Sequence, residues 1–194
     1  MGIIKENRGV SSVVATVLLI LLSVIAVTLL ISFVRPFVEK NLKKSTECLP
    51  YQEYFEFKET YNDGQKDISY NCWEQRTGYV LTGAMVSGKE GIRSEDLGLL
   101  DGFQVVFKDA NSVVESVKVL EGATTNRNLS SIWVFNYTTN ILSFPKPGDS
   151  QLYVYNGSRA FSSEEIYPVL KTGKVCEKID SIMLKKCEAG ISLS

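Results

Sequence analysis

The sequence predicts a long N-terminal hydrophobic α-helix followed by an all-β globular domain of the Ig-like β-sandwich type. Residues 10–34 contain no charged residue, glycine or proline. This run indicates one continuous apolar helix, longer than the roughly 20 residues that span a bilayer. Beyond residue 47 the apolar residues fall in short runs separated by turn residues, with no convincing amphipathic helix between them. Such spacing is typical of a β-sandwich.

The predicted helix covers residues 10–46 and therefore continues past the apolar run. Residues 35–44 are mostly good helix formers, although Pro36 removes one backbone hydrogen bond. A helix over residues 10–44 would be about 50 Å long, which exceeds the thickness of a bilayer. The alternative is a plain single-pass anchor that ends at Arg35 and is followed by a polar linker. Residues 47–194 form the predicted globular domain, and residues 41–47 are the only plausible linker.

The domain contains a series of predicted strands with clear turn signals between them. In residues 102–107 the alternation places Phe103, Val105 and Phe107 on one face. Asn156-Gly157 predicts a hairpin turn after a strand, and residues 145–148 (PKPG) break any regular structure. Residues 181–186 fit a helical turn or a short strand equally well. The predicted strands are residues 51–57, 79–82, 102–107, 113–120, 132–135, 140–144, 151–155 and 166–170, the last of the series.

Composition excludes several classes of function. The chain has 21 basic and 22 acidic residues, a balance that gives no support to nucleic-acid binding. It has no histidine, which excludes His-based triads and His metal sites. We therefore expect a protein that is not an enzyme and has no cofactor and no bound metal. A hydrolase that uses scattered carboxylates is a remote alternative. The carboxylates in question are Glu53, Glu56, Glu90, Glu95, Asp96, Asp101, Glu164 and Glu165.

The four cysteines, Cys48, Cys72, Cys176 and Cys187, all follow the apolar run. None forms a C-x-x-C pair, so zinc and thioredoxin-like sites are disfavoured. An even number outside a membrane segment predicts two disulfides in an oxidising compartment. Of the three connectivities we favour Cys48–Cys72 with Cys176–Cys187, because each bond closes a short loop. Free cysteines buried as small apolar residues are the alternative.

Three sequons and a group of aromatic residues are candidate surface features. Asn128, Asn136 and Asn156 each begin an Asn-x-Ser/Thr triplet and are candidate N-glycosylation sites on an extracellular domain. The alternative for Asn156 is a simple hairpin turn. The aromatic residues could form an adhesive patch, but we expect them to form the sandwich core and cross-strand pairs.

The N-terminal junction carries a family resemblance. A short charged leader, residues 1–9, ends in Arg8-Gly9 directly before Val10 and the apolar run. This junction resembles the class III signal peptide of type IV pilins and archaellins, which a membrane peptidase cleaves after the glycine. Here cleavage would separate Gly9 from Val10. The sequence from Val10 to Ile20, VSSVVATVLLI, is similar to archaeal adhesion-type pilins. It departs from bacterial pilins, which usually carry glutamate at the fifth mature position, where this chain has Val14.

The resemblance implies a structural subunit of an archaeal type IV pilus-like filament. Such a subunit polymerises through its N-terminal helix, with the β-domain outside, and the resemblance implies a role in adhesion. Its implied partners are copies of itself, a prepilin peptidase and the pilus assembly machinery. It would lie in the cell membrane before assembly and in a surface filament afterwards. The alternatives are a non-polymerising, membrane-anchored binding domain or minor pilin and, with less support, an archaellin.

Overall fold

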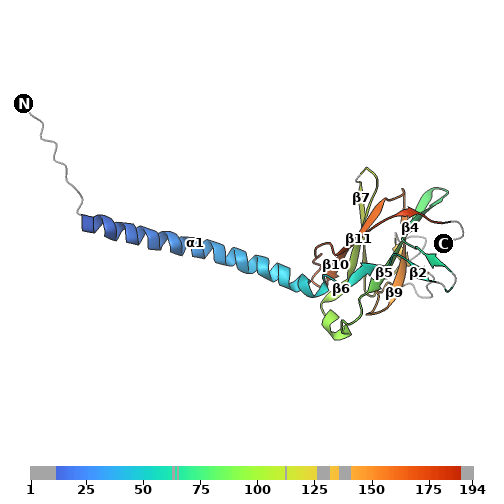
Figure 1. The fold of residues 1–194 in the computed structure, drawn as a ribbon, viewed down its shortest axis with the longest axis horizontal. Helices are drawn as coiled ribbons and strands as arrows, with labels where there is room; N and C mark the ends of the chain where they lie inside the picture. Colours follow the sequence, from blue (N-terminus) through green and yellow to red (C-terminus); the bar gives the residue numbers. More distant parts are fainter. Residues whose placement is uncertain are drawn as a thin grey trace, which may run out of the picture. The chain divides into compact units, whose positions relative to one another are not determined.

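The computed structural model describes residues 12–62, 64, 66–111, 113–125, 132–135 and 141–188 (Figure 1). The chain divides into two units, Met1–Glu47 and Cys48–Ser194. The first unit contains the helix α1 (Ser12–Cys48), of 37 residues. The second unit contains all the strands. The predicted combination of a long apolar helix and a β-sandwich domain is confirmed.

Helix α1 extends well beyond the apolar run. It includes Pro36 and ends at Cys48, so the alternative helix that stops at Arg35 is wrong. Residues after Pro36 such as Glu39, Leu42 and Lys43 are good helix formers, and the missing proline N–H removes only one hydrogen bond from the ladder.

Twelve strands and two short 3-10 helices are assigned in the described part of the domain. The 3-10 helices are η1 (Leu49–Tyr51) and η2 (Ser94–Leu97). The strands are β1 (Phe55–Phe57), β2 (Tyr61–Asn62), β3 (Asp67–Ile68), β4 (Cys72–Arg76), β5 (Tyr79–Gly88), β6 (Leu100–Lys108), β7 (Val114–Leu120), β8 (Ile132–Val134), β9 (Ser150–Gly157), β10 (Ser163–Leu170), β11 (Asp180–Met183) and β12 (Lys185–Lys186).

Two sheets make the sandwich. The larger sheet has the order β12-β4-β5-β9-β8, and β1 pairs with the second half of β5, beyond the part that β4 occupies. The smaller sheet has the order β11-β10-β6-β7. Strands β2 and β3 form a separate hairpin. The pairs within the sheets are antiparallel except β12 with β4, which is parallel.

The core lies between the facing sides of the two sheets. Phe103 and Phe107 of β6 contact Tyr153 and Tyr155 of β9, with ring centroids 5.2 Å and 4.6 Å apart. The predicted inward face of β6 is therefore confirmed. Most of the aromatic side chains considered for an adhesive patch are buried here or close by. These are Tyr51, Tyr54, Phe55, Phe57, Trp133, Tyr153 and Tyr155, whereas Tyr79 is exposed.

A second apolar cluster lies on the other face of the larger sheet. Leu81 and Met85 of β5 and Leu152 and Val154 of β9 pack there with Trp133. Because neighbouring residues of a strand point to opposite faces, β5 and β9 are buried on both sides. This explains why β5 reaches Gly88 although its sequence lacks a simple alternation of polar and apolar residues.

Several predicted strand boundaries are wrong. Residues 51–57 form a strand only from Phe55, because η1 and a turn precede it. Asn156-Gly157 continues β9 and makes no turn, and residues 141–144 contain only an isolated bridge at Ile141. The strand at 166–170 is not the last, since β11 and β12 follow. Residues 181–186 therefore adopt the strand alternative.

Candidate functional site

The candidate site for membrane insertion or assembly is the surface of α1. The side chains described from residue 13 to residue 39 are all exposed, and most of them are Val, Leu, Ile or Phe. The segment Val13–Glu39 is long and apolar enough to cross a membrane, a criterion that a signal sequence near an N-terminus also meets. Burial of apolar area stabilises by about 25 cal/mol per Å². Such a surface is therefore stable in lipid or against other apolar surfaces.

Four hydroxyl groups on this surface are already paired within the helix. Thr16, Ser23, Thr28 and Ser32 each donate a hydrogen bond of 2.8–2.9 Å to a backbone carbonyl three or four residues earlier. An unpaired hydroxyl would oppose transfer out of water. Because these four are satisfied locally, α1 can enter lipid or a dry helix–helix contact without leaving a polar side chain unpaired at these positions.

Charged residues begin at Arg35 and mark the end of the apolar surface. Arg35 Nε donates to Glu39 Oε1 at 2.9 Å, and both side chains are well exposed. An exposed pair with this i,i+4 spacing adds only a few tenths of a kcal/mol. Lys40, Lys43 and Lys44 follow in the same helix. Residues 35–44 of α1 are called the basic stem below.

The two disulfides are present, but the favoured connectivity is wrong. Cys48 is bonded to Cys176, and Cys72 is bonded to Cys187. The Cα atoms lie 5.6 Å and 4.9 Å apart, within the usual range. The preference for short loops was a weak guide, because the cost of closing a loop rises only slowly with its length. The fold decides the pairing by bringing the end of α1 to the segment before β11.

The disulfides clamp a segment that joins the two sheets. Residues 176–187 begin at the bond to Cys48 and end at the bond to Cys72. Between these bonds β11 pairs with β10 of the smaller sheet, and β12 pairs with β4 of the larger sheet. Loss of either bond would free one end of this connection. Two disulfides also indicate an oxidising, extracellular type of environment.

Of the predicted processing and glycosylation residues, the structure describes only Asn156. Arg8, Gly9 and Val10 lie outside the described residues, as do Asn128 and Asn136. Asn156 is described: it is exposed and lies in β9, opposite Leu81 of β5. The predicted hairpin turn at Asn156 is not formed, so a glycan on this residue would be attached to a strand.

The carboxylates considered for catalysis are dispersed or already paired. Glu53 bonds to Lys89 at 2.6 Å, and this hydrogen bond lowers the pKa of Glu53. Arg93 pairs with both Glu95 and Asp96. No group of three or more His, Cys, Asp or Glu residues that could hold a metal ion occurs in the described part of the chain.

Glu164 and Glu165 are adjacent in β10 but lie in opposite environments. Glu164 has the same parity as Ile166 and points into the core, where it is fully buried and neither carboxyl oxygen has a hydrogen-bond partner among the described residues. Burial raises its pKa well above the ordinary value. Glu165 lies on the outer face of the sheet. The two do not form a carboxylate pair of the kind that glycosidases use.

Glu165 is the centre of an ion-pair cluster. Its carboxylate accepts hydrogen bonds from Lys108 at 2.8 Å, Tyr167 at 2.7 Å and Lys178 at 3.3 Å. Burial by itself would raise the pKa of Glu165, but these bonds outweigh it and lower the pKa to about 2. The cluster ties β10, β6 and the segment before β11 together. Nothing in the sequence pairs Lys108 with Glu165, because 57 residues separate them in the chain.

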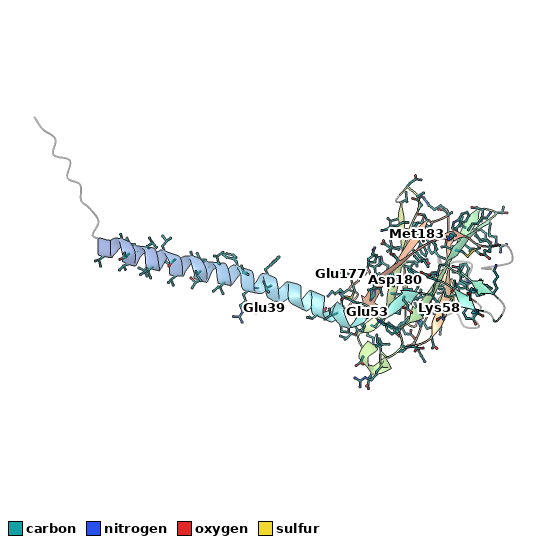
Figure 2. The ribbon with its side chains drawn as sticks, viewed as in Figure 1. Glu39, Glu53, Lys58, Glu177, Asp180 and Met183 are labelled. Carbon is teal, nitrogen blue, oxygen red and sulfur yellow. A yellow bond between two sulfur atoms is a disulfide. The ribbon has the colours of Figure 1, made fainter. Side chains whose placement is uncertain are left out.

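The described surface of the domain has hollows, among them one beside β11 and β12 and one beside η1. One, of about 520 Å³, is lined by residues of β11 and β12, by the disulfide residue Cys72 and by the β2–β3 region. The other, of about 430 Å³, lies between η1 and residues 89–92. Figure 2 shows the side chain of Glu53, which lines the second hollow. Sequence reasoning missed both hollows, because each depends on loop packing that no periodic pattern encodes.

Comparisons with known proteins add no assignment. No family model, no curated protein and no solved structure matches this chain.

Proposed function

We propose that this chain is a pilin, a structural subunit of an archaeal type IV pilus-like surface filament. The observation that carries the proposal is the Arg8-Gly9-Val10 junction directly before a helix whose apolar side chains are exposed along its described length. The junction supports removal of residues 1–9 by a prepilin peptidase. The mature chain would then begin with the apolar helix.

The physical chemistry of α1 supports assembly. In the membrane, lipid covers the apolar surface of the helix before assembly. In a filament, the helices of identical copies replace lipid contacts by packing on one another. The small residues Ser11, Ser12, Ala15, Ser23 and Ala26 permit close approach of two helices. Contacts between different surfaces of identical copies generate a helical fibre when the rotation between copies does not close a ring.

The β-domain supports a role on the outside of the filament. Its two disulfides suit an oxidising exterior, and Asn156 is an exposed candidate for glycosylation. In this proposal the domain coats the fibre and provides adhesion. Its partners are the assembly machinery of the membrane and further copies of the chain.

Substitution of Gly9 tests the proposal. Gly9→Val places a branched side chain at the cleavage position, so the leader is expected to remain and filaments to be lost. Gly2→Val is the matched control, because it changes a leader glycine away from the junction. Electron microscopy of the cell surface and the mass of the membrane-bound chain are the measurements. Unchanged filaments in Gly9→Val cells would refute the proposal.

A membrane-anchored surface domain that never polymerises is the second candidate. The apolar span Val13–Glu39 favours it as much as it favours a filament. In that case Gly9→Val and Gly2→Val leave the location of the protein unchanged, and no filament contains the chain. The same experiment therefore separates the two candidates.

A further inference from the structure

A hollow of about 430 Å³ lies beside the first residues that follow α1. Its apolar wall is made by Leu49 and Pro50 of η1 and by Ile92. The Leu49 side chain is 59% exposed, so this part of the wall presents apolar surface to solvent. The rest of the lining is polar and includes Glu53, Lys89 and Glu90.

One negative charge at this hollow has no partner among the residues that the structure describes. Glu53 is neutralised by Lys89 through their 2.6 Å contact. Glu90 is exposed and makes no hydrogen bond or ion pair with the residues that the structure describes. Its side chain lies over Gly148, where an added Cβ would be 3.4 Å from Glu90 Cγ. The hollow therefore combines an apolar wall with an unpaired carboxylate.

A lysine side chain has the complementary chemistry. Its four methylene groups can cover apolar surface while the terminal ammonium reaches a carboxylate. The basic stem of α1 contains Lys40, Lys43 and Lys44. The stem has four basic residues and one acidic residue, Glu39.

We infer that this hollow receives a lysine side chain from the basic stem of a second copy of the chain. The inference rests on the proposed function, since only an assembled form brings copies together. Each copy offers one hollow and one stem. The contact joins two different surfaces, so it propagates from copy to copy when the rotation between copies does not close a ring. It adds a charged, register-setting contact to the apolar packing of the helices, which alone is not directional.

Charge reversal in the hollow and in the stem tests the inference. Glu90→Lys places two like charges together and is expected to raise the unassembled fraction roughly tenfold. Glu59→Lys is the matched control, because Glu59 is also exposed and makes no hydrogen bond or ion pair among the described residues, but it lines the other hollow. A stem variant, Lys40→Glu/Lys43→Glu/Lys44→Glu, is expected to lose assembly in the same way.

Combination of Glu90→Lys with the stem variant in one chain restores opposite charges, so assembly is expected to return to within about twofold of the wild type. The measurement is the fraction of chain that sediments as filaments after shearing, at low and at high salt. Wild-type assembly is expected to weaken with salt, because exposed charges are screened. Near-ultraviolet circular dichroism of the domain confirms that each variant is folded.

Two results would overturn the inference while leaving the proposed function in place. Glu90→Lys could assemble as well as Glu59→Lys, which would show that the hollow makes no contact between copies. Glu90→Lys, the stem variant and their combination could all fail to assemble. That result would show that the hollow and the stem meet other partners, such as lipid head groups. If wild-type chains form no filament at all, the proposed function itself is refuted and the inference falls with it.

Discussion

Asp180 of β11 accepts a hydrogen bond of 2.7 Å from the backbone N–H of Phe57 in β1, and so links the edges of the two sheets. Figure 2 labels Asp180. Its other carboxylate oxygen accepts the backbone N–H of Ser181 at 2.8 Å. One side chain therefore satisfies donors on two strand edges, which would otherwise be unpaired.

Asp180→Ala is expected to destabilise the domain by about 1–3 kcal/mol, because it leaves the buried N–H of Phe57 without an acceptor. Asp180→Asn keeps one acceptor oxygen and should cost less. Glu56→Ala, at an exposed position of β1, is the control. Urea unfolding measures all three variants. Equal stabilities of Asp180→Ala and Glu56→Ala would show that the link does not contribute.

Peptide mapping without reduction is expected to recover a Cys48 peptide joined to a Cys176 peptide and a Cys72 peptide joined to a Cys187 peptide. Replacing the first pair by serines should cost about 2–5 kcal/mol of stability, since each bond closes a long loop. The opposite finding, Cys48 joined to Cys72, would mean that residues 176–187 are not clamped between the sheets.

The raised pKa of buried Glu164 predicts that the domain loses stability as the pH rises. Burial raises the pKa of the Glu164 carboxyl in the folded state well above its ordinary value of 4.5. Below pH 4.5 both folded and unfolded states bind the proton. Above it the unfolded state releases the proton and the folded state keeps it, so stability falls by up to about 1.4 kcal/mol per pH unit until the folded pKa is reached.

Glu164→Gln removes this dependence, so the variant is expected to gain stability relative to wild type as the pH rises from 5 to 8. Glu56→Gln, which changes an exposed carboxylate, should show no such gain. Thermal unfolding across this pH series measures the difference. Parallel wild-type and Glu164→Gln curves would mean that Glu164 ionises freely in the folded domain.

The lowered pKa of Glu165 predicts the opposite pH dependence, a loss of stability as the pH falls into the acid range. Its pKa is lowered from 4.5 to about 2 despite burial, through its bonds to Lys108, Tyr167 and Lys178. The stabilisation is therefore present above pH 4.5 and is lost as the pH falls towards 2. Glu165→Gln is expected to cost about 1–3 kcal/mol at pH 7, less than the full shift implies because Lys108 and Lys178 are partly exposed.

The same unfolding experiment at pH 2 tests this assignment. There the wild type and Glu165→Gln should have nearly equal stability, because most of the wild-type carboxylate stabilisation is gone. A cost that is the same at pH 2 and pH 7 would assign the role of Glu165 to packing and not to charge.

The sequence was sufficient for the helix and for strands buried on one face. Residues 10–34 predict a helix because they contain no charged residue, glycine or proline. Strand β6 was predicted because Phe103, Val105 and Phe107 alternate with less buried residues. Strand β4 was missed because its sequence, CWEQR, is largely polar and lacks an apolar alternation. Strands β11 and β12 are short edge strands that depend on tertiary pairing.

The disulfide pairing and the Glu165 cluster depend on contacts between distant parts of the chain, which no local pattern encodes. The position of Glu164 could have been predicted, because counting back two residues from Ile166 places it on the core face. The basic residues of the stem can be identified from the sequence, but the hollow proposed to bind them cannot. The hollow at Glu90 exists only where η1 meets residues 89–92.

The central claim is that this chain is processed and assembled as a pilin, and the N-terminal residue of the native protein tests it most directly. The measurement is mass spectrometry of material sheared from the cell surface. The proposed function predicts Val10 as the first residue of chains in the sheared filaments. Met1 retained on a chain that stays in the membrane fraction would contradict it.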